Sequence, residues 1–301
     1  MNEMNKPLCG QSGANTGIPE CDFVPGRQVG IILVRKSKVF TGVELEDFLG
    51  TLKKLAQAAK SERIYPVFRF GTLNDSSVEP TEASLGIGYG RYVNDGSYKL
   101  TYPLVNGSAY YVEQLRKFNG DKYAVLIVHD NGITGTRTDD GGVRGFTLSQ
   151  FYVHKPKMGD DSNPTTYNVE ISLPKPTEFV DRLAFLATDK DVEYEVKGVR
   201  DYRTIQKNAT ANALSIDIVD ACTKESIIDV YGTELADKAI WTASGGDITA
   251  VTLSGTVLSF TGTFADGDML ICADTATLAE KGIGGSPEYG LEIGPLTIKV
   301  A

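Results

Sequence analysis

Short segments in which apolar and polar residues alternate, separated by glycine, asparagine and aspartate, dominate the chain from Ile64 onward. Every second side chain of a strand faces the same side, so this period of two predicts half-buried β-strands. Consecutive strands joined by short turns favour an antiparallel sandwich or barrel. The strands predicted with this pattern are 64–70, 84–93, 97–105, 123–128, 133–137, 143–154, 165–173, 179–187 and 192–199, and the short apolar run 29–34 predicts a further strand before them.

Two segments depart from this pattern and predict helices that pack on the β domain. Thr41 and Glu44 have the spacing of a capping box, and the residues of 44–60 place a leucine-rich stripe on one helical face. The second helix is expected from Ser108, as N-cap, to Gly120 at the C′ position. Between the strands 84–93 and 97–105, Asp95-Gly96 predicts a hairpin turn.

A second domain is predicted after a boundary near 200–212, where the polar run 207–212 interrupts the pattern. Beyond it, strands are expected at 214–219, 248–253, 257–264, 269–273 and 296–300, and a helix at 225–239 stays open as an alternative. Trp241, the single tryptophan, is expected in the core. Domain size, strand spacing and a core aromatic predict a small immunoglobulin-like β-sandwich.

Residues 1–26 contain glycines and prolines with almost no hydrophobic periodicity. We expect an extended N-terminal arm, of the kind that assemblies use to reach a neighbouring subunit. The predicted organisation is therefore the arm 1–26, a β domain 27–205 and an immunoglobulin-like domain 206–301.

The net charge of −9 is unevenly divided along the chain. Residues 1–200 carry 24 Lys and Arg against 25 Asp and Glu, a net charge of −1, whereas residues 201–301 carry 6 against 14, a net charge of −8. Such an acidic segment repels nucleic acid, so we expect no DNA or RNA binding through a basic patch.

No run approaches the roughly 18 apolar residues that a membrane-spanning helix needs, and the sequence begins without the basic and apolar regions of a secretory signal. We expect no membrane partner and synthesis in the cytoplasm.

No pattern in the sequence indicates an enzyme, a metal site or a cofactor site. Gly86, Gly88 and Gly90 lack the following helix that a dinucleotide loop requires, and they fit a bent strand better. His129 and His154 are expected to make structural hydrogen bonds at strand ends. The remaining candidates are turn aspartates and widely spaced thiols, for which we predict no catalytic, cofactor-binding or metal-binding role: Asp139-Asp140, Asp160-Asp161, Cys9, Cys21, Cys222 and Cys272. A bridge between Cys9 and Cys21 stays open for a protein that ends up outside a cell.

The order of elements from 97 to 173 carries a resemblance to a known family. It reads strand, helix 109–119, strand 123–128, a turn and short strand, then the segment 145–153, a charged Gly-Asp-Asp turn and the strand 166–173. This order resembles the core of the tail tube (major tail) proteins of tailed bacteriophages. The C-terminal domain resembles the immunoglobulin-like additions of phage tail proteins. The helix at 44–60 and the N-terminal arm are additions to the simplest members.

The resemblance implies a structural virion protein, made in the cytoplasm of a host bacterium, that assembles with itself and with other tail proteins. It implies stacked rings, hexameric in that family, around a lumen that DNA passes through without specific contacts. The near-neutral first domain would form the wall, with 72–82, 155–164 or the arm contacting the next ring, and the acidic domain would face solvent. Alternatives that the residues leave open are a head decoration protein, a fibre-anchoring or other surface binding protein, and an enzyme.

Overall fold

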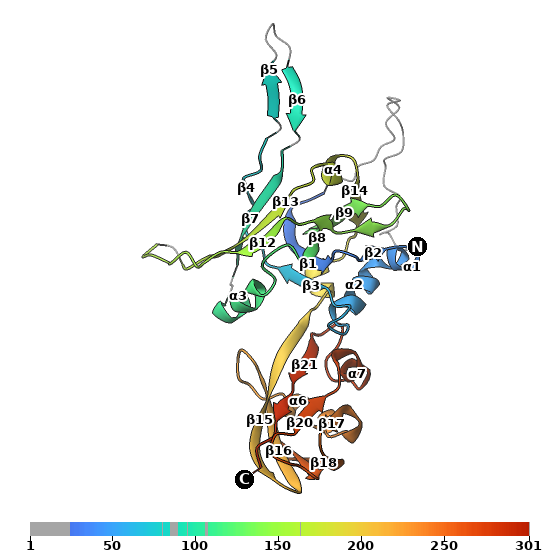
Figure 1. Ribbon diagram of the computed structural model, residues 1–301, viewed down its shortest axis with the longest axis vertical. Coiled ribbons are helices and arrows are strands. Elements are labelled where there is room, and N and C mark those ends of the chain that lie inside the picture. The colour runs from blue at the N-terminus through green and yellow to red at the C-terminus, as the bar shows by residue number, and fades with distance from the viewer. Residues whose placement is uncertain are drawn as a thin grey trace. The chain divides into compact units, whose positions relative to one another are not determined.

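The computed structural model describes residues 25–300 apart from Pro80, 85–89, Asp95, Asn106, Gly107 and Asn163, and without the side chains of 82–84 and 90–94 (Figure 1). The arm predicted at 1–26 thus lies outside the described residues except for its last two. The chain is mainly β, as the sequence predicts, with 43% strand against 18% helix, and it forms several antiparallel sheets and a curled half-barrel. It divides into two compact units: the first holds the chain up to Leu52 and Ile64–Glu195, and the second holds Lys53–Arg63 and Val196–Ala301.

The larger sheet of the first unit is built on two long apolar strands, β1 (Gln28–Arg35) and β8 (Tyr123–His129). Its strand order is β2-β10-β9-β8-β1-β3, with β14 beside β9 and β11 beside β8, all antiparallel. The remaining strands are β2 (Val39–Phe40), β3 (Tyr65–Phe68), β9 (Gly132–Arg137), β10 (Val143–Arg144), β11 (Phe146–Thr147) and β14 (Leu183–Ala187).

This sheet is buried on both faces. Ile31 and Leu33 of β1 belong to the core shared with the second sheet. Ile32 and Val34 point the other way and are also fully buried. A strand covered on both sides needs apolar residues at every position, which explains the uninterrupted run at 31–34.

The second sheet of this unit has the order β12-β13-β7-β4 and shows the alternating pattern of a half-exposed sheet. Its strands are β4 (Asn74–Asp75), β7 (Tyr98–Leu104), β12 (Gln150–Val153) and β13 (Tyr167–Leu173). One face packs on the core of the larger sheet. The two sheets join at a corner, where the amide of Val105 donates to the carbonyl of Arg69 (2.9 Å) and Gly71 to that of Pro103 (2.8 Å).

The predicted first helix is broken into α1 (Val43–Glu46) and α2 (Phe48–Ala56). Asp47 leaves the helical region, and its carboxylate accepts a hydrogen bond from the amide of Gly50 (3.1 Å), as an N-cap does for a new helix. Only half of the predicted capping box forms: Glu44 reaches back to the amide of Thr41, but Gly42 holds the N-cap position. The second helix, α3 (Ala109–Arg116), is confirmed at its start, where Ser108 accepts from the amide of Tyr111. Its predicted end was wrong: Lys117 is the C-cap, so Gly120 does not hold the C′ position.

Several strand predictions were wrong in their boundaries. The predicted strand 84–93 meets β5 (Thr81–Ser84) only at Ser84 and otherwise corresponds to β6 (Gly90–Asn94), while 85–89 and Asp95 lie outside the described residues. β6 pairs with β5 and not with β7, so the predicted hairpin between 84–93 and 97–105 was wrong. The single strand predicted at 143–154 is β10, β11 and β12. Short helices replace parts of two further strands: α4 (Thr177–Val180) precedes β14, and α5 (Val192–Glu195) ends the first unit.

The second unit contains a five-stranded sheet of order β18-β19-β16-β15-β21 and a three-stranded sheet of order β17-β20-β22. The strands are β15 (Val199–Thr210), β16 (Ala213–Asp220), β17 (Trp241–Ala243), β18 (Ile248–Ser254), β19 (Val257–Gly262), β20 (Met269–Cys272), β21 (Gly290–Gly294) and β22 (Leu296–Thr297), with helices α6 (Ile228–Leu235) and α7 (Thr275–Glu280). Trp241 is in the core as predicted, and its indole N–H donates to the carbonyl of Leu235 (2.8 Å). No immunoglobulin domain is identified here, since β15 and β21 run parallel and two helices contribute to the core.

The division between the units differs from the predicted boundary at 205/206. That position lies inside β15, whose partners β16 and β21 both belong to the second unit. The polar run 207–212 is therefore the end of this strand and its turn. The second unit also contains 53–63, because Gln57 donates to the carbonyl of Glu288 (2.7 Å) and buried Arg63 binds Glu292 (2.6 Å) and Thr275 (3.2 Å).

Candidate assembly surface

The two histidines lie in different sheets and make separate contacts. His129, at the end of β8, is buried, with Nδ1 2.9 Å from the carbonyl oxygen of Gly26 and Nε2 3.0 Å from the hydroxyl of Thr134. Burial lowers its pKa by disfavouring the charged imidazolium. His154 follows β12, and its Nε2 lies 3.2 Å from Glu170. Both histidines thus make hydrogen-bond contacts at strand ends.

The other candidates for site chemistry are scattered. Asp139 binds Arg182, and Asp160 accepts from the amide of Ser162 in a turn. Cys222 is exposed, whereas burial raises the pKa of Cys272 to about 12. Cys9, Cys21, Gly86 and Gly88 lie outside the described residues. Among the residues that are described, no three His, Cys, Asp or Glu side chains gather as a metal site would require, and no helix has the length and apolar character to span a membrane.

One edge of the second sheet is closed by the end of α3. The backbone groups of β12 that point away from β13 belong to Phe151 and Val153. Phe151 exchanges two hydrogen bonds with Gly120 (2.8 and 2.9 Å), and the amide of Val153 donates to the side chain of Asn119 (3.0 Å). An edge whose backbone groups are occupied cannot accept a further strand. No pattern in the sequence indicates this cap, since it depends on where α3 ends in space.

The strand order of the larger sheet ends at β2 and at β3, and β14 lies off this order beside β9. β3 contains Pro66, whose missing N–H makes it unsuited to a central strand. This residue was visible in the sequence as a marker of an edge. β14 pairs with β9, and its sequence Leu-Ala-Phe-Leu-Ala is entirely apolar.

Two β extensions leave the second sheet. The first is the hairpin of β5 and β6, which form a two-stranded sheet of their own and pair with each other (Figure 1). At its base, Val78 and Ser97 exchange hydrogen bonds (2.9 and 3.3 Å), and the Val78 side chain is 60% exposed. Gly96 has φ of 78°, and a Cβ at this position would meet the carbonyl oxygen of Val78. The junction therefore requires glycine.

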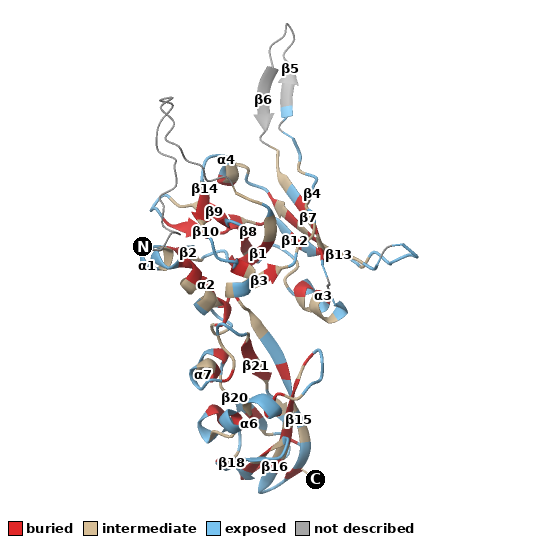
Figure 2. Cartoon of the chain, turned by 180° about the vertical axis from the view of Figure 1, so that it is seen from behind, coloured by how far each residue is buried: buried red, intermediate tan, exposed pale blue. Residues whose placement is uncertain are grey.

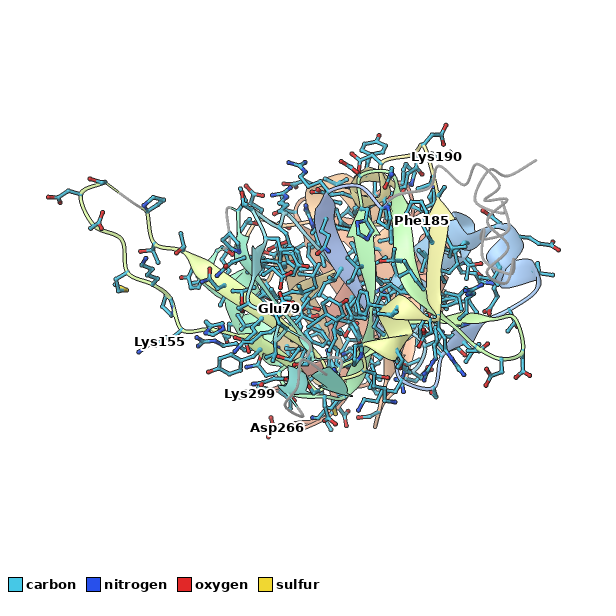
Figure 3. All side chains as sticks on the ribbon, turned by 90° about the horizontal axis from the view of Figure 1, so that it is seen from above. Glu79, Lys155, Phe185, Lys190, Asp266 and Lys299 are labelled. Carbon is cyan, nitrogen blue, oxygen red and sulfur yellow. The ribbon has the colours of Figure 1, made fainter. Side chains whose placement is uncertain are left out.

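The second extension is the loop between β12 and β13, residues 154–166. Lys157 and Thr166 pair across it, and the described residues between them, 158–162 and 164–165, are exposed (Figure 2). Lys155, labelled in Figure 3, lies where the loop leaves the sheet. Met158 is 77% exposed, the side chain of an apolar residue in water. Both extensions start from the same sheet, and both carry an exposed apolar residue.

The outer face of the second sheet is polar and paired. Glu170 of β13 lies 3.2 Å from both Lys99 of β7 and His154, so its carboxylate contacts side chains on both sides of its own strand. The ring of Tyr152 meets that of His154 edge to face at 5.0 Å. Cross-strand pairs of this kind stabilise a solvated sheet face.

A buried carboxylate holds α4 against the larger sheet. Glu178 is 4% exposed and accepts hydrogen bonds from the amide and hydroxyl of Thr147 (both 2.7 Å) and from Arg144 (3.1 Å). The next residue, Phe179, stacks on Phe146 with ring centroids 4.0 Å apart. Both oxygens of the Glu178 carboxylate accept hydrogen bonds from neighbouring residues, as buried polar groups do in a structural role.

Neither the family models nor the curated proteins searched contain a match to this chain.

Proposed function

We propose that the chain is a structural virion protein of a tailed phage, whose first unit forms the wall of the tail tube in stacked hexameric rings. DNA passes through the lumen of this tube without specific contacts. The second unit is a decoration on the outside, in the place that immunoglobulin-like additions occupy on tail proteins. The proposal rests on the resemblance of the segment 97–173 and on the two extensions described above.

The pair of extensions is the observation that carries the proposal. An isolated two-stranded hairpin is marginally stable in water, so β5 and β6 gain most from contact with another surface. The exposed side chains Val78 and Met158 would be covered by such a contact. In a stack of rings, extensions of one sheet reach the ring above or below.

The sheet edges indicate which surfaces of the subunit can contact its neighbours within a ring. The cap of Asn119 and Gly120 blocks strand addition at β12, and Pro66 weakens it at β3. Closed rings need a heterologous interface, in which two different surfaces of one subunit meet. The apolar strand β14 and the loops beside it are the surface that we assign to one side of this interface.

Electron microscopy of the purified chain tests the proposal, with two variants and a matched control. Val78→Asp and Met158→Asp place a charge on each extension, and we expect both to shorten or abolish tubes while circular dichroism stays unchanged. Val230→Asp is the control, because Val230 is 70% exposed on α6 of the second unit. We expect it to form tubes of normal length.

Other outcomes overturn the proposal. Discrete oligomers of the wild-type chain would favour a head decoration or fibre-anchoring protein, and monomers at all concentrations would exclude self-assembly as the function. Normal tubes from both extension variants would remove the extensions from the assembly contacts.

A further inference from the structure

The outermost strand of the five-stranded sheet, β18, is an uncharged sheet edge. It pairs with β19 on one side and lies at the end of the strand order. Six of its seven residues are exposed or half-exposed, and Leu253 is 41% exposed. The whole segment 248–265 contains no charged residue and no proline.

The β18 edge lacks the features that hinder strand addition at β12 and β3 of the first unit. Charge, proline, a capping segment or a very short strand keeps most sheet edges from pairing with other chains. β12 has its cap and β3 has Pro66, whereas β18 has a single bulge at Thr249, between the pairs Ile248–Gly262 and Ala250–Thr261. The bulge disturbs the first part of the strand and leaves Ala250–Ser254 regular.

The turn determines which backbone groups of the regular part point outward. β18 and β19 are joined through Gly255 and Thr256, with Ser254 paired to Val257. In a two-residue hairpin this closing pair is hydrogen-bonded, and hydrogen-bonded pairs then recur at every second residue. Ala250, Thr252 and Ser254 therefore bond to β19, while Val251 and Leu253 present their N–H and C=O groups to the outside.

We propose that β18 pairs antiparallel with β18 of a second copy of this chain, about a two-fold axis at Thr252. In this register Val251 of one copy lies opposite Leu253 of the other, and the two pairs exchange four backbone hydrogen bonds. Their apolar side chains meet on one face, and the two Thr252 side chains lie opposite each other on the other face. The five-stranded sheets of both copies join into one continuous sheet.

The self-complementarity of the strand is the reason for choosing a second copy as the occupant. The two outward-facing residues are each other's partners in this register, and the bulge at Thr249 falls beyond the paired residues. The nearest charged residue, Asp247, falls opposite Val257 beyond the turn, so no like charges meet. The β18–β18 contact is separate from the contacts of the proposed tube. Rings that stack in one direction need head-to-tail contacts, whereas a two-fold pair joins the same surface of both copies.

Charge exchange at Thr252 tests the pairing. Thr252 is exposed, so Thr252→Lys and Thr252→Glu leave the monomer intact but place like charges directly opposite each other in the dimer. Sedimentation equilibrium of the full chain, after any tubes have been pelleted, is expected to show a dimer whose dissociation constant rises at least about tenfold in either variant. An equimolar mixture of the two variants should regain the wild-type affinity, as a heterodimer that native mass spectrometry resolves.

Ala213→Lys is the matched control, because Ala213 is exposed on β16, two strands in from the edge, and should leave the dimer unchanged. Trp241 fluorescence verifies that the second unit is folded in every variant. A wild-type chain that stays monomeric at about 100 μM overturns the proposal. So does a Thr252→Lys variant that dimerises normally, or a mixture that fails to recover.

Discussion

Replacing Glu178 by alanine should destabilise the first unit substantially. The carboxylate accepts two hydrogen bonds of 2.7 Å from Thr147, and bonds to a charged acceptor contribute about 1.5–3 kcal/mol each before the neighbours relax. Arg144 is about a third exposed, so water replaces most of its interaction, which we place below about 0.5 kcal/mol. With partial relaxation, we expect Glu178→Ala to lower the free energy of unfolding by about 2–4 kcal/mol.

Urea denaturation followed by far-ultraviolet circular dichroism measures this loss, and amide exchange at Thr147 should quicken because its acceptor is gone. Glu178→Gln keeps one acceptor oxygen and should lose less. Glu113→Gln, an exposed residue of α3, is the control and should stay within about 0.5 kcal/mol of the wild type. A Glu178→Ala variant as stable as this control would refute the reasoning that the buried carboxylate holds α4 in place.

Further predictions concern the first unit and the arm. Burial lowers the pKa of His129, so the unfolded chain binds the proton more tightly than the folded chain does. The contribution of His129 to stability is therefore fully present above the unfolded pKa of about 6.5 and declines as the pH falls toward the folded pKa. His129→Gln should remove this pH dependence in denaturation curves recorded from pH 7.5 to 5. Asn119→Ala should cost about 1 kcal/mol in urea denaturation and speed amide exchange at Val153, since the cap of β12 is lost. Gly96→Ala should lower the melting temperature, because its positive φ and the carbonyl of Val78 leave no room for a methyl group. Deletion of 1–24 should leave the circular dichroism spectrum unchanged and shorten the tubes seen by electron microscopy.

The elements that depend on local sequence were predictable. The apolar runs of β1 and β8 and the cap of α3 at Ser108 follow from periodicity and from a side chain that reaches an amide three residues away. The break at Asp47 was not predicted, because the helical stripe of 44–60 continues through it. What ends α1 there is a competing local hydrogen bond to Gly50, which hydrophobic periodicity does not reveal.

The elements that depend on distant partners were not predictable. The run 207–212 has the composition of a linker, yet its first part is strand, because β16 supplies the partner backbone. The sheet-edge residues of the candidate assembly surface also include one that was predictable and one that was not. Pro66 marks an edge strand by its chemistry alone, whereas the cap by Asn119 depends on the position of α3 beside β12.

The placement of 53–63 in the second unit has a consequence for the order of events during synthesis. Arg63 is translated 229 residues before its partner Glu292, and Gln57 precedes Glu288 by 231. At about 5–20 residues per second, the ribosome needs roughly 10–50 s to deliver those partners. During that interval the nascent first unit can close its own sheets, while the early segment stays without its β21 neighbours. A chain whose synthesis stops before Gly290 therefore lacks β21, and its early segment 53–63 is left without the partners that hold it in the second unit.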